Sequence, residues 1–288
     1  MPTNEVHEIN IDALLPAEMA VRAESIGVRK AGLPFWTVLT LSILAGAFIA
    51  LGAIFATTVA AGVSGVLPYG IARLLIGLVF SLGLILVVVG GAELFTGNNL
   101  IVMAWAGGKV STFALLRNWV IVYLGNLIGS LGTALLMFMS KQYTFGTGAV
   151  GAAALSIANS KVHLGFVQAI FLGIMCNVLV CLAVWMTYSA RSTVDKIMAI
   201  IFPITAFVAG GFEHSIANMY YIPMALLIKE YDPAFVTTTK LAIDGLSWPT
   251  FFVNNLIPVT IGNIIGGAVL VAIIYWFVFL RHLTKEKA

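Results

Sequence analysis

The residues best suited to chemistry lie in the segment AGGFEHSIAN at 209–218, between two long apolar runs. Glu213, His214 and Asn218 bring a carboxylate, an imidazole and a carboxamide into surroundings otherwise suited to hydrocarbon. Such groups are costly at bilayer depth unless they have partners or a function. An imidazole, whose ordinary pKa is about 6.5, exchanges protons near neutral pH. The segment therefore predicts a polar site within a membrane, at which His214 supplies a proton or a hydrogen bond.

A second segment repeats this pattern in the first half of the chain. GGAELFTGN at 90–98 and GGFEHSIAN at 210–218 both read Gly-Gly-x-Glu, with an asparagine eight residues after the first glycine. Further along, GNLIG at 125–129 matches GNIIG at 262–266. Two matches in the same order indicate an internal repeat. The second copy is longer because it contains the polar region near 229–248.

The glycine pairs predict that a helix is interrupted in each copy. An interruption frees backbone N–H and C=O groups where water is absent, so polar side chains must satisfy them. We expect this structural task, rather than proton transfer, for four residues: Glu93, Asn98, Glu213 and Asn218. Asn126 and Asn263 are flanked by glycine, as in packed membrane helices. Their pattern fits either helix packing or the lining of a pore.

His214 differs from these residues because the repeat does not require it. Its counterpart in the first copy is Leu94. A single histidine within a membrane is often just a hydrogen-bonded core residue. The loss of internal symmetry at the interruption itself favours a functional role for His214.

Composition defines the class of protein. Hydrophobic residues make up 60% of the 288 positions, charged residues make up 9%, and the mean hydropathy is +1.03. Soluble domains carry roughly 25% charged residues, so this chain is predicted to be an integral membrane protein. The net charge of +3 is spread over short loops, which argues against nucleic-acid binding. Cys176 and Cys181 are expected in the core, and no cofactor or metal site is predicted. Residues 1–32 lack the pattern of a cleaved signal peptide.

Six apolar stretches are long enough to cross about 30 Å of hydrocarbon. They cover 33–57, 71–104, 119–139, 164–189, 197–228 and 250–280. The second and fifth, with 34 and 32 residues, are too long for one crossing and are predicted to be paired half-helices. We therefore predict an all-α polytopic membrane protein with six spans in two inverted three-span repeats, the second and fifth spans being broken. Paired broken helices indicate a substrate path near the midplane. The sequence NNLIP at 254–258 predicts that the last span begins late, after a loop.

Basic residues predict the orientation. Ten of the 15 lysines and arginines fall on the side of both termini and five on the other side. Because cytoplasmic loops are enriched in these residues, both termini are predicted to be cytoplasmic. The chain divides into a cytoplasmic N-terminal helix at 1–32, a transmembrane channel domain at 33–280 and a cytoplasmic tail at 281–288. Residues 11–32 read as an amphipathic helix that is either a gate or a solvated leader.

The interruptions also carry a family resemblance. VVGGAELFTG at 88–97 and GIMCNVLVCLA at 173–183 resemble both signature segments of the formate/nitrite transporter family. The likeness extends from LLPAEMA at 14–20 to NNLIPVTIGNIIGG at 254–267, and the chain most resembles the formate channels of enteric and related bacteria. The resemblance implies an aquaporin-like six-span protomer in the bacterial inner membrane. It also implies a homopentamer with one pore in each protomer and selectivity for small monovalent anions.

The resemblance assigns roles by position. His214 is similar to the family's central pore histidine, and Thr96 to the threonine of the loop that breaks the second span. Four residues match the two hydrophobic constrictions: Phe80, Leu84, Leu94 and Phe207. Three more match two pore-region asparagines and an outer-vestibule lysine linked to anion attraction: Asn177, Asn263 and Lys161. The loop reads FTGNN, with Gly97, Asn98 and Asn99 where small or β-branched residues are expected. Its mobility, and any pH gate built on it, are therefore left open.

The implied mechanism follows from the cost of moving charge. A bare carboxylate in an apolar constriction costs on the order of 20 kcal/mol by an idealised Born estimate. Protonating an acid of pKa about 4 at pH 7 costs only about 4 kcal/mol. We therefore predict that Lys161 and half-helix N–H groups attract the anion, that His214 protonates it, and that the neutral acid passes the constrictions. The predicted function is a proton-coupled channel or transporter for formate and related anions.

Other functions fit the sequence less well. A nitrite or hydrosulfide channel of the same family is the first alternative. A neutral-solute channel is disfavoured because the chain lacks the paired Asn-Pro-Ala boxes of aquaporins. An enzyme is not predicted, since His214 and Ser215 point about 100° apart on a helix. The expected partners are formate-like anions, protons, the lipid bilayer and further copies of the chain. Nucleic acid is not expected, and no cytoplasmic regulator of the N-terminal helix is named.

Overall fold

The computed structural model of the protein describes residues 13–63 and 65–282, and all regular structure in these ranges is helical. Parts of the predicted N-terminal helix (1–12) and C-terminal tail (283–288) lie outside the described residues. The α-helices are α1 Pro16–Ala31, α2 Phe35–Ala60, α3 Tyr69–Gly90, α4 Phe95–Asn98, α5 Val102–Ala106, α6 Thr112–Met139, α7 Ala149–Val162, α8 Phe166–Thr187, α9 Thr193–Ala209, α10 Ser215–Tyr231, α11 Pro233–Thr239, α12 Trp248–Thr250, α13 Ile257–Ile264 and α14 Ile274–Phe279. The 3₁₀ turns are η1 Asn99–Ile101 and η2 Gln142–Thr144, and the π-helical segments are η3 Phe251–Leu256 and η4 Ile265–Ile273.

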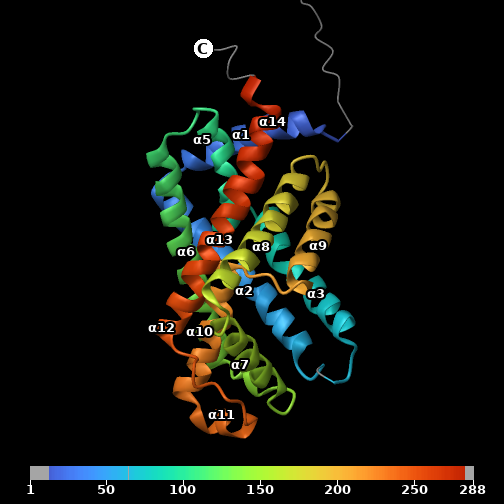
Figure 1. Ribbon diagram of the computed structural model, residues 1–288, viewed down its shortest axis with the longest axis vertical. Coiled ribbons are helices and arrows are strands. Elements are labelled where there is room, and N and C mark those ends of the chain that lie inside the picture. Colours follow the sequence, from blue (N-terminus) through green and yellow to red (C-terminus); the bar gives the residue numbers. More distant parts are fainter. Residues whose placement is uncertain (1–12, 64, 283–288) are drawn as a thin grey trace, which may run out of the picture.

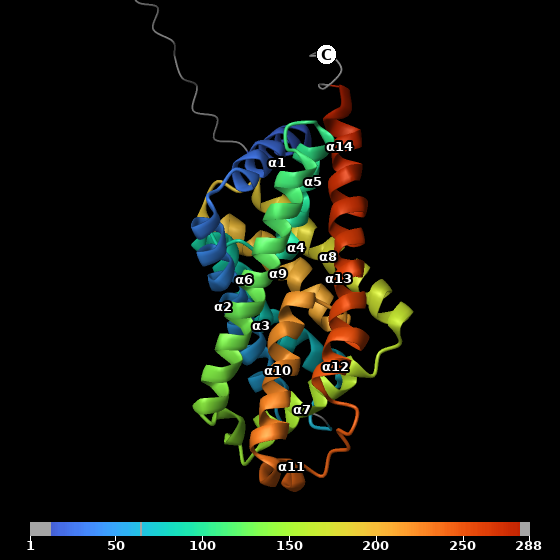
Figure 2. The ribbon, with the colours of Figure 1, turned by 90° about the vertical axis from the view of Figure 1, so that its left-hand side faces the viewer.

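The helices form an elongated bundle. α1, α5 and α14 lie at one end, and α7 and α11 lie toward the other (Figures 1 and 2). We refer to these as the α1 end and the α7 end. Between them α2 packs against α3 and α6, and α8 packs against α9 and α13.

The outside of the bundle is apolar and the inside holds polar groups. α2, α3, α6, α8 and the continuous helix 248–279 are each long and apolar enough to cross a membrane. The exposed face of α6 carries an apolar residue at every fourth position: Leu116, Val120, Leu124 and Ile128. On the same helix Asn118 and Asn126 are buried. This distribution is that of a multi-pass membrane protein whose outer surface meets lipid.

Helix is interrupted at both glycine pairs. Residues 91–94 separate α3 from α4, and residues 210–214 separate α9 from α10. The second glycine of each pair has a left-handed backbone, with φ of 77° at Gly91 and 74° at Gly211. Glycine adopts this conformation without the steric cost that other residues meet. We call residues 91–94 the first break and residues 210–214 the second break.

The two Gly-Asn motifs bring helices into backbone contact. A Cβ at Gly129 on α6 would overlap the carbonyl oxygen of Ile43 on α2. A Cβ at Gly266, in η4, would overlap the carbonyl oxygen of Ile174 on α8. Small residues allow such close approach between membrane helices. The matched motifs therefore have the same packing role in both halves.

α1 is fastened to the segment that follows the first break. Gly27 faces Ile101 and Ala104, where a Cβ would be crowded. Buried Glu24 forms an ion pair with Lys109, in the turn after α5. The amphipathic N-terminal helix is therefore docked along its described length.

The last span begins earlier than predicted. The helix starts at Trp248, and NNLIP lies inside it, within η3 and the start of α13. Pro258 falls next to the π-helical turn, where the hydrogen-bond ladder is already irregular. Asn255 stays in the helix because its side chain bonds inward to Asn218 and to the carbonyl of Lys161.

Candidate functional site

Two hollows enter the bundle from opposite ends and nearly meet. The α1-side vestibule, about 250 Å³, is lined by parts of α1, α3, α8, α9 and the first break. The α7-side vestibule, about 280 Å³, is lined by parts of α3, α7, α9, α10 and the second break. Between them lies a chamber of about 10 Å³, near the minimum that holds one water molecule.

Each vestibule is separated from the chamber by apolar side chains. The four predicted constriction residues all line the chamber. Leu84 and Leu94 also line the α1-side vestibule, whereas Phe80 and Phe207 line the α7-side vestibule. The rings of Phe80 and Phe207 meet edge to face, with centroids 5.6 Å apart. A solute that moves between the vestibules must therefore pass one apolar pair on each side of the chamber.

His214 connects the second break to α4, the short helix that follows the first break. It lines the chamber and the α7-side vestibule and is the residue that precedes α10. Its Nδ1 accepts the backbone N–H of Ala217 at 3.1 Å, which caps α10. Its Nε2 lies 3.0 Å from the hydroxyl of Thr96, and its ring stacks on Phe207 at 5.8 Å. His214 and Thr96, to which the family resemblance assigns separate roles, therefore lie in direct contact.

These contacts determine which ring nitrogen of His214 carries the hydrogen. A backbone N–H can only donate, so Nδ1 must be the acceptor and a neutral ring carries its hydrogen on Nε2. That hydrogen is donated to the Thr96 oxygen. If both ring nitrogens were protonated, the Nδ1–H of His214 and the backbone N–H of Ala217 would be two donors facing each other. The surroundings of His214 therefore favour the neutral ring.

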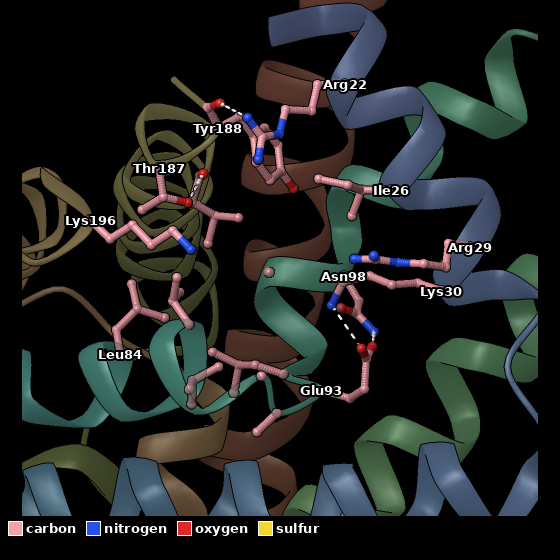
Figure 3. Close-up of a pocket in the computed structure, with 17 residues that line it drawn as sticks. Arg22, Ile26, Arg29, Lys30, Leu84, Glu93, Asn98, Thr187, Tyr188 and Lys196 are labelled. Carbon is pink, nitrogen blue, oxygen red and sulfur yellow. Dashed lines mark hydrogen bonds and ion pairs between the residues drawn. The ribbon is translucent and has the colours of Figure 1, made fainter. Parts of the chain in front are cut away.

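The first break is held by a buried polar network. The Lys30 ammonium, from α1, lies 3.0 Å from Glu93 Oε1 and 2.9 Å from Asn98 Oδ1. Asn98 donates to the other oxygen of Glu93 at 2.7 Å and to Asn118 Oδ1 at 3.0 Å. Asn118 in turn donates to the carbonyl of Lys30. Figure 3 shows Lys30, Asn98 and Glu93 together at the wall of the α1-side vestibule.

The second break repeats this network residue by residue. The Lys161 ammonium lies 2.7 Å from Glu213 Oε1. Asn218 donates to Glu213 Oε2 and to Asn255 Oδ1, both at 2.7 Å. Asn255 donates to the carbonyl of Lys161. One difference is that Lys161 does not reach the buried Asn218 Oδ1, which has no hydrogen-bond partner among the described residues, and instead lies 5.5 Å from the Tyr221 ring.

The partners of the opened backbone differ from the prediction. We expected Glu93, Asn98, Glu213 and Asn218 to satisfy the freed N–H groups. Instead, Asn126 accepts from the Phe95 N–H at 3.0 Å, and Asn263 accepts from the Ser215 N–H at 2.9 Å. A buried carboxylate is stabilised more by a lysine ammonium and charge-assisted hydrogen bonds than by lone backbone groups. The two glutamates therefore form ion pairs with the lysines. The asparagines of the Gly-Asn motifs therefore hold the backbone of the breaks.

Three members of the networks were not predicted. Asn118 and Asn255 had a usable signal, because each stands eight residues before the asparagine of a Gly-Asn motif, Asn126 or Asn263. No sequence pattern marked Lys30, because it reaches Glu93 from a separate helix, α1.

Asn177 and Asn263 lie behind Thr96 rather than on the chamber wall. Both are fully buried. The Asn177 amide nitrogen is 3.3 Å from the carbonyl oxygen of Thr96 and 2.7 Å from that of Asn263. They support the backbone around the chamber, as a second layer beneath its lining.

The α1-side vestibule carries the unpaired positive charge. Four cations line it: Arg22, Arg29, Lys30 and Lys196 (Figure 3). The side chains of Arg29 and Lys196 have no hydrogen-bond or ion-pair partner within residues 13–63 and 65–282. In the α7-side vestibule both cations are engaged, because Arg73 binds carbonyl groups at the end of α9 and Lys161 binds Glu213. Anions therefore meet more free positive charge at the α1 end.

The sequence is similar to those of known proteins. A family model described as formate/nitrite transporter matches residues 17–277. The chain is 48% identical over 275 residues to the formate channel FocA of Escherichia coli K12, covering 94% of this chain and 96% of that one. It is 41% identical over 289 residues to the formate channel FocA of Haemophilus influenzae, covering 98% and 99%.

Solved structures share the fold. A pentameric formate channel with formate bound superposes with a TM-score of 0.80 at 47% identity, covering 86% of this chain and 98% of that one. An FNT family ion channel superposes with a TM-score of 0.78 at 28% identity, covering 91% and 98%. With the sequence matched along nearly its whole length, the chain belongs to the formate/nitrite transporter family.

Proposed function

We propose that the protein carries formate and similar small monovalent anions across the bacterial cytoplasmic membrane, with one pore in each protomer of a homopentamer. One observation carries this proposal: two vestibules nearly meet at a chamber lined by His214 of the second break, whose ring contacts Thr96, two residues after the first break. The relatives support the choice of anion and assembly, since two are named formate channels and one solved neighbour is described as pentameric with formate bound.

The proposed topology is six spans in two inverted three-span halves. It is supported by the matching networks around Glu93 and Glu213, because equivalent contacts at both breaks are what a structural repeat produces. Three spans per half place the second half upside down relative to the first. The excess of lysine and arginine at the α1 end favours a cytoplasmic location for that end and for both termini.

The apolar constrictions require that charge is removed before passage. The chamber is bounded by Leu84 and Leu94 on one side and Phe80 and Phe207 on the other, which offer no hydrogen bonds to an anion. A bare charge there costs on the order of 20 kcal/mol by the idealised Born estimate, against about 4 kcal/mol for protonation at pH 7. A small acid therefore crosses as the neutral molecule. The small chamber favours one-carbon acids and nitrite over larger carboxylates.

His214 is proposed to supply the proton. The resting ring is neutral and donates its Nε2 hydrogen to Thr96. An anion that enters the chamber offsets the cost of a positive ring, so the ring takes up a proton from the vestibule and then passes one proton to the carboxylate. The ring is neutral before and after the step. The free cations at the α1 end raise the local concentration of anions on that side, whereas the charge of Lys161 is offset by Glu213.

The test is transport by the purified protein in liposomes. Labelled formate, nitrite and lactate, with hydrosulfide and water as further solutes, are measured side by side. We expect rapid formate and nitrite flux and little lactate flux. Phe207→Ala should widen the α7-side constriction and admit lactate. Phe202→Ala is the matched control, because Phe202 lies on the same helix with its side chain 71% exposed, away from the chamber.

The proposal fails if intact pentamers carry neither formate nor nitrite. The proposed pore fails if Phe207→Ala and Phe202→Ala carry lactate at the same rate. A hydrosulfide flux well above that of formate would assign the channel to that anion instead.

A further inference from the structure

The segment that follows the first break holds one polar side chain that the segment after the second break lacks. The Asn99 side chain is fully buried, directly after the Asn98 that joins the lysine network. Its Oδ1 accepts from the Asn177 amide at 3.0 Å, and its Nδ2 donates to the carbonyl of Phe95 at 3.1 Å. The equivalent position after Asn218 is Met219, a buried apolar residue. A break of this type therefore keeps its shape without an amide at that position.

Asn177 links Asn99 to Thr96. Its amide nitrogen faces three acceptors: Asn99 Oδ1, the Thr96 carbonyl at 3.3 Å and the Asn263 carbonyl at 2.7 Å. The thiol of Cys181 lies 3.3 Å from the same Thr96 carbonyl. The backbone of Thr96 is thus fixed from behind by Asn177, while its hydroxyl meets His214 in front.

Gly267 leaves room for the contact between Asn99 and Asn177. A Cβ at Gly267 would collide with the Asn177 amide and lie 2.9 Å from Asn99 Cβ. In the matched Gly-Asn motif the corresponding residue is Ser130, whose hydroxyl donates to the carbonyl of Gly46 on α2. Gly46 and Asn177 are equivalent, because each stands three residues after the isoleucine, Ile43 or Ile174, that faces a Gly-Asn motif. In the first half the glycine of this facing pair is therefore on α2, and in the second half it is Gly267, in η4. The second half omits a side chain at Gly267 where Asn177 and Asn99 need room.

We propose that Asn99 is a positioning residue for transport. It acts through Asn177 to hold the Thr96 hydroxyl against His214, and it does not itself contact the transported anion. The proposal rests on the proposed function, because it assigns the residue that fixes the geometry of the proposed His214–Thr96 site. It also makes the FTGNN segment, which forms α4 and the start of η1, a fixed element in this chain, because Asn98 and Asn99 both hold it by hydrogen bonds.

The test is a double-substitution cycle on formate flux. Asn99→Leu keeps the approximate size of the side chain and removes both hydrogen bonds. Loss of alignment at a reacting site is costly, and we expect the maximal formate flux to fall by about tenfold with little change in KM. In a Thr96→Val background Asn99→Leu should have no further effect, because the hydroxyl that it positions is already absent. Met219→Leu, a volume-conserving change at the equivalent position, should leave flux unchanged.

The outcomes separate this inference from the proposed function. If wild-type protein carries formate but Asn99→Leu lowers flux by the same factor with and without the Thr96 hydroxyl, Asn99 is structural and the inference is overturned. Wild-type flux in Asn99→Leu overturns it too. Absence of formate flux in the wild type defeats the proposed function itself. If Asn99→Leu does not assemble as a pentamer, Asn99→Ala gives the same cycle with a smaller side chain.

Discussion

Replacing His214 by asparagine isolates the chemical role of the imidazole from its structural role. The ring has two polar contacts, besides its stacking on Phe207: Nδ1 caps α10 through the Ala217 N–H, and Nε2 meets Thr96. Asparagine is among the most favourable N-cap residues, so its Oδ1 can accept the Ala217 N–H. The change therefore keeps the cap and removes the group that exchanges protons. We expect the folded protein to change in stability by no more than about 1 kcal/mol.

The size of the transport defect follows from the contact that is lost. A hydrogen bond to a charged group contributes about 1.5–3 kcal/mol. If the ring gives that contact only while the anion is being protonated, its loss slows proton-coupled uptake by about 10- to 150-fold. Passive movement of the anion should persist, and it should be largely outward, because the free cations Arg29 and Lys196 concentrate anions at the α1 end. His214→Phe removes the cap as well and should block the pore or abolish its anion selectivity.

The assay is formate uptake into liposomes driven by an imposed pH gradient, with internal pH followed at the same time. The ratio of protons to formate is the decisive quantity. His163→Asn is the control, because it makes the same exchange at an exposed histidine whose ring bonds to the Asn159 carbonyl, away from the chamber. If His214→Asn imports formate and protons together at the wild-type ratio and rate, the histidine is not the proton donor and its role is to cap α10.

Three further predictions test other parts of the site. Thr96→Val keeps the shape and removes the hydroxyl that meets His214, so formate flux should fall by about tenfold or more while pentamers still form; wild-type flux would make Thr96 a packing residue only. Lys196→Gln should raise the formate KM about two- to fivefold from the α1 side and much less from the α7 side, with the difference shrinking at high salt, whereas equal changes from both sides would contradict a local charge effect. Deletion of residues 1–28 removes most of α1 and its Glu24–Lys109 ion pair, and should alter the rate or direction of formate flux without dissociating the pentamer; unchanged transport would show that α1 is not a gate.

The sequence was informative where a short motif has only one physical interpretation. Two adjacent glycines in an apolar stretch predicted both breaks, because few other reasons place them before a buried acid. The family resemblance also singled out Thr96 and His214, and their contact at 3.0 Å is seen only in the folded chain. The helical start of the last span was not predicted, since NNLIP has the composition of a loop. It is helical because Asn255 finds buried partners on other helices, and these partners are distant in sequence.

The lysine partners show why the rest of the site could not be read from local patterns. Glu93 and Glu213 looked suited to backbone N–H groups, since no cation stands near either one in the sequence. Lys30 lies 63 residues before Glu93, and Lys161 lies 52 residues before Glu213. Only the folded arrangement brings α1 and α7 against the breaks. A long-range ion pair leaves no local periodicity, although the repeated spacing of Asn118 and Asn255 before the Gly-Asn motifs does mark the second half of each network.

The internal repeat provides a way to separate framework from function within one chain. Residues that match between the halves, such as Glu93 with Glu213, are explained by the shared need to hold a broken helix. Residues that do not match are not explained in that way. Three such differences, Leu94 with His214, Asn99 with Met219 and Gly46 with Asn177, all fall around the point where Thr96 meets the histidine. Both halves need the polar network that holds a broken helix, but only one histidine is needed for transport. The positions at which the two halves differ around His214 therefore indicate where the transported anion is handled.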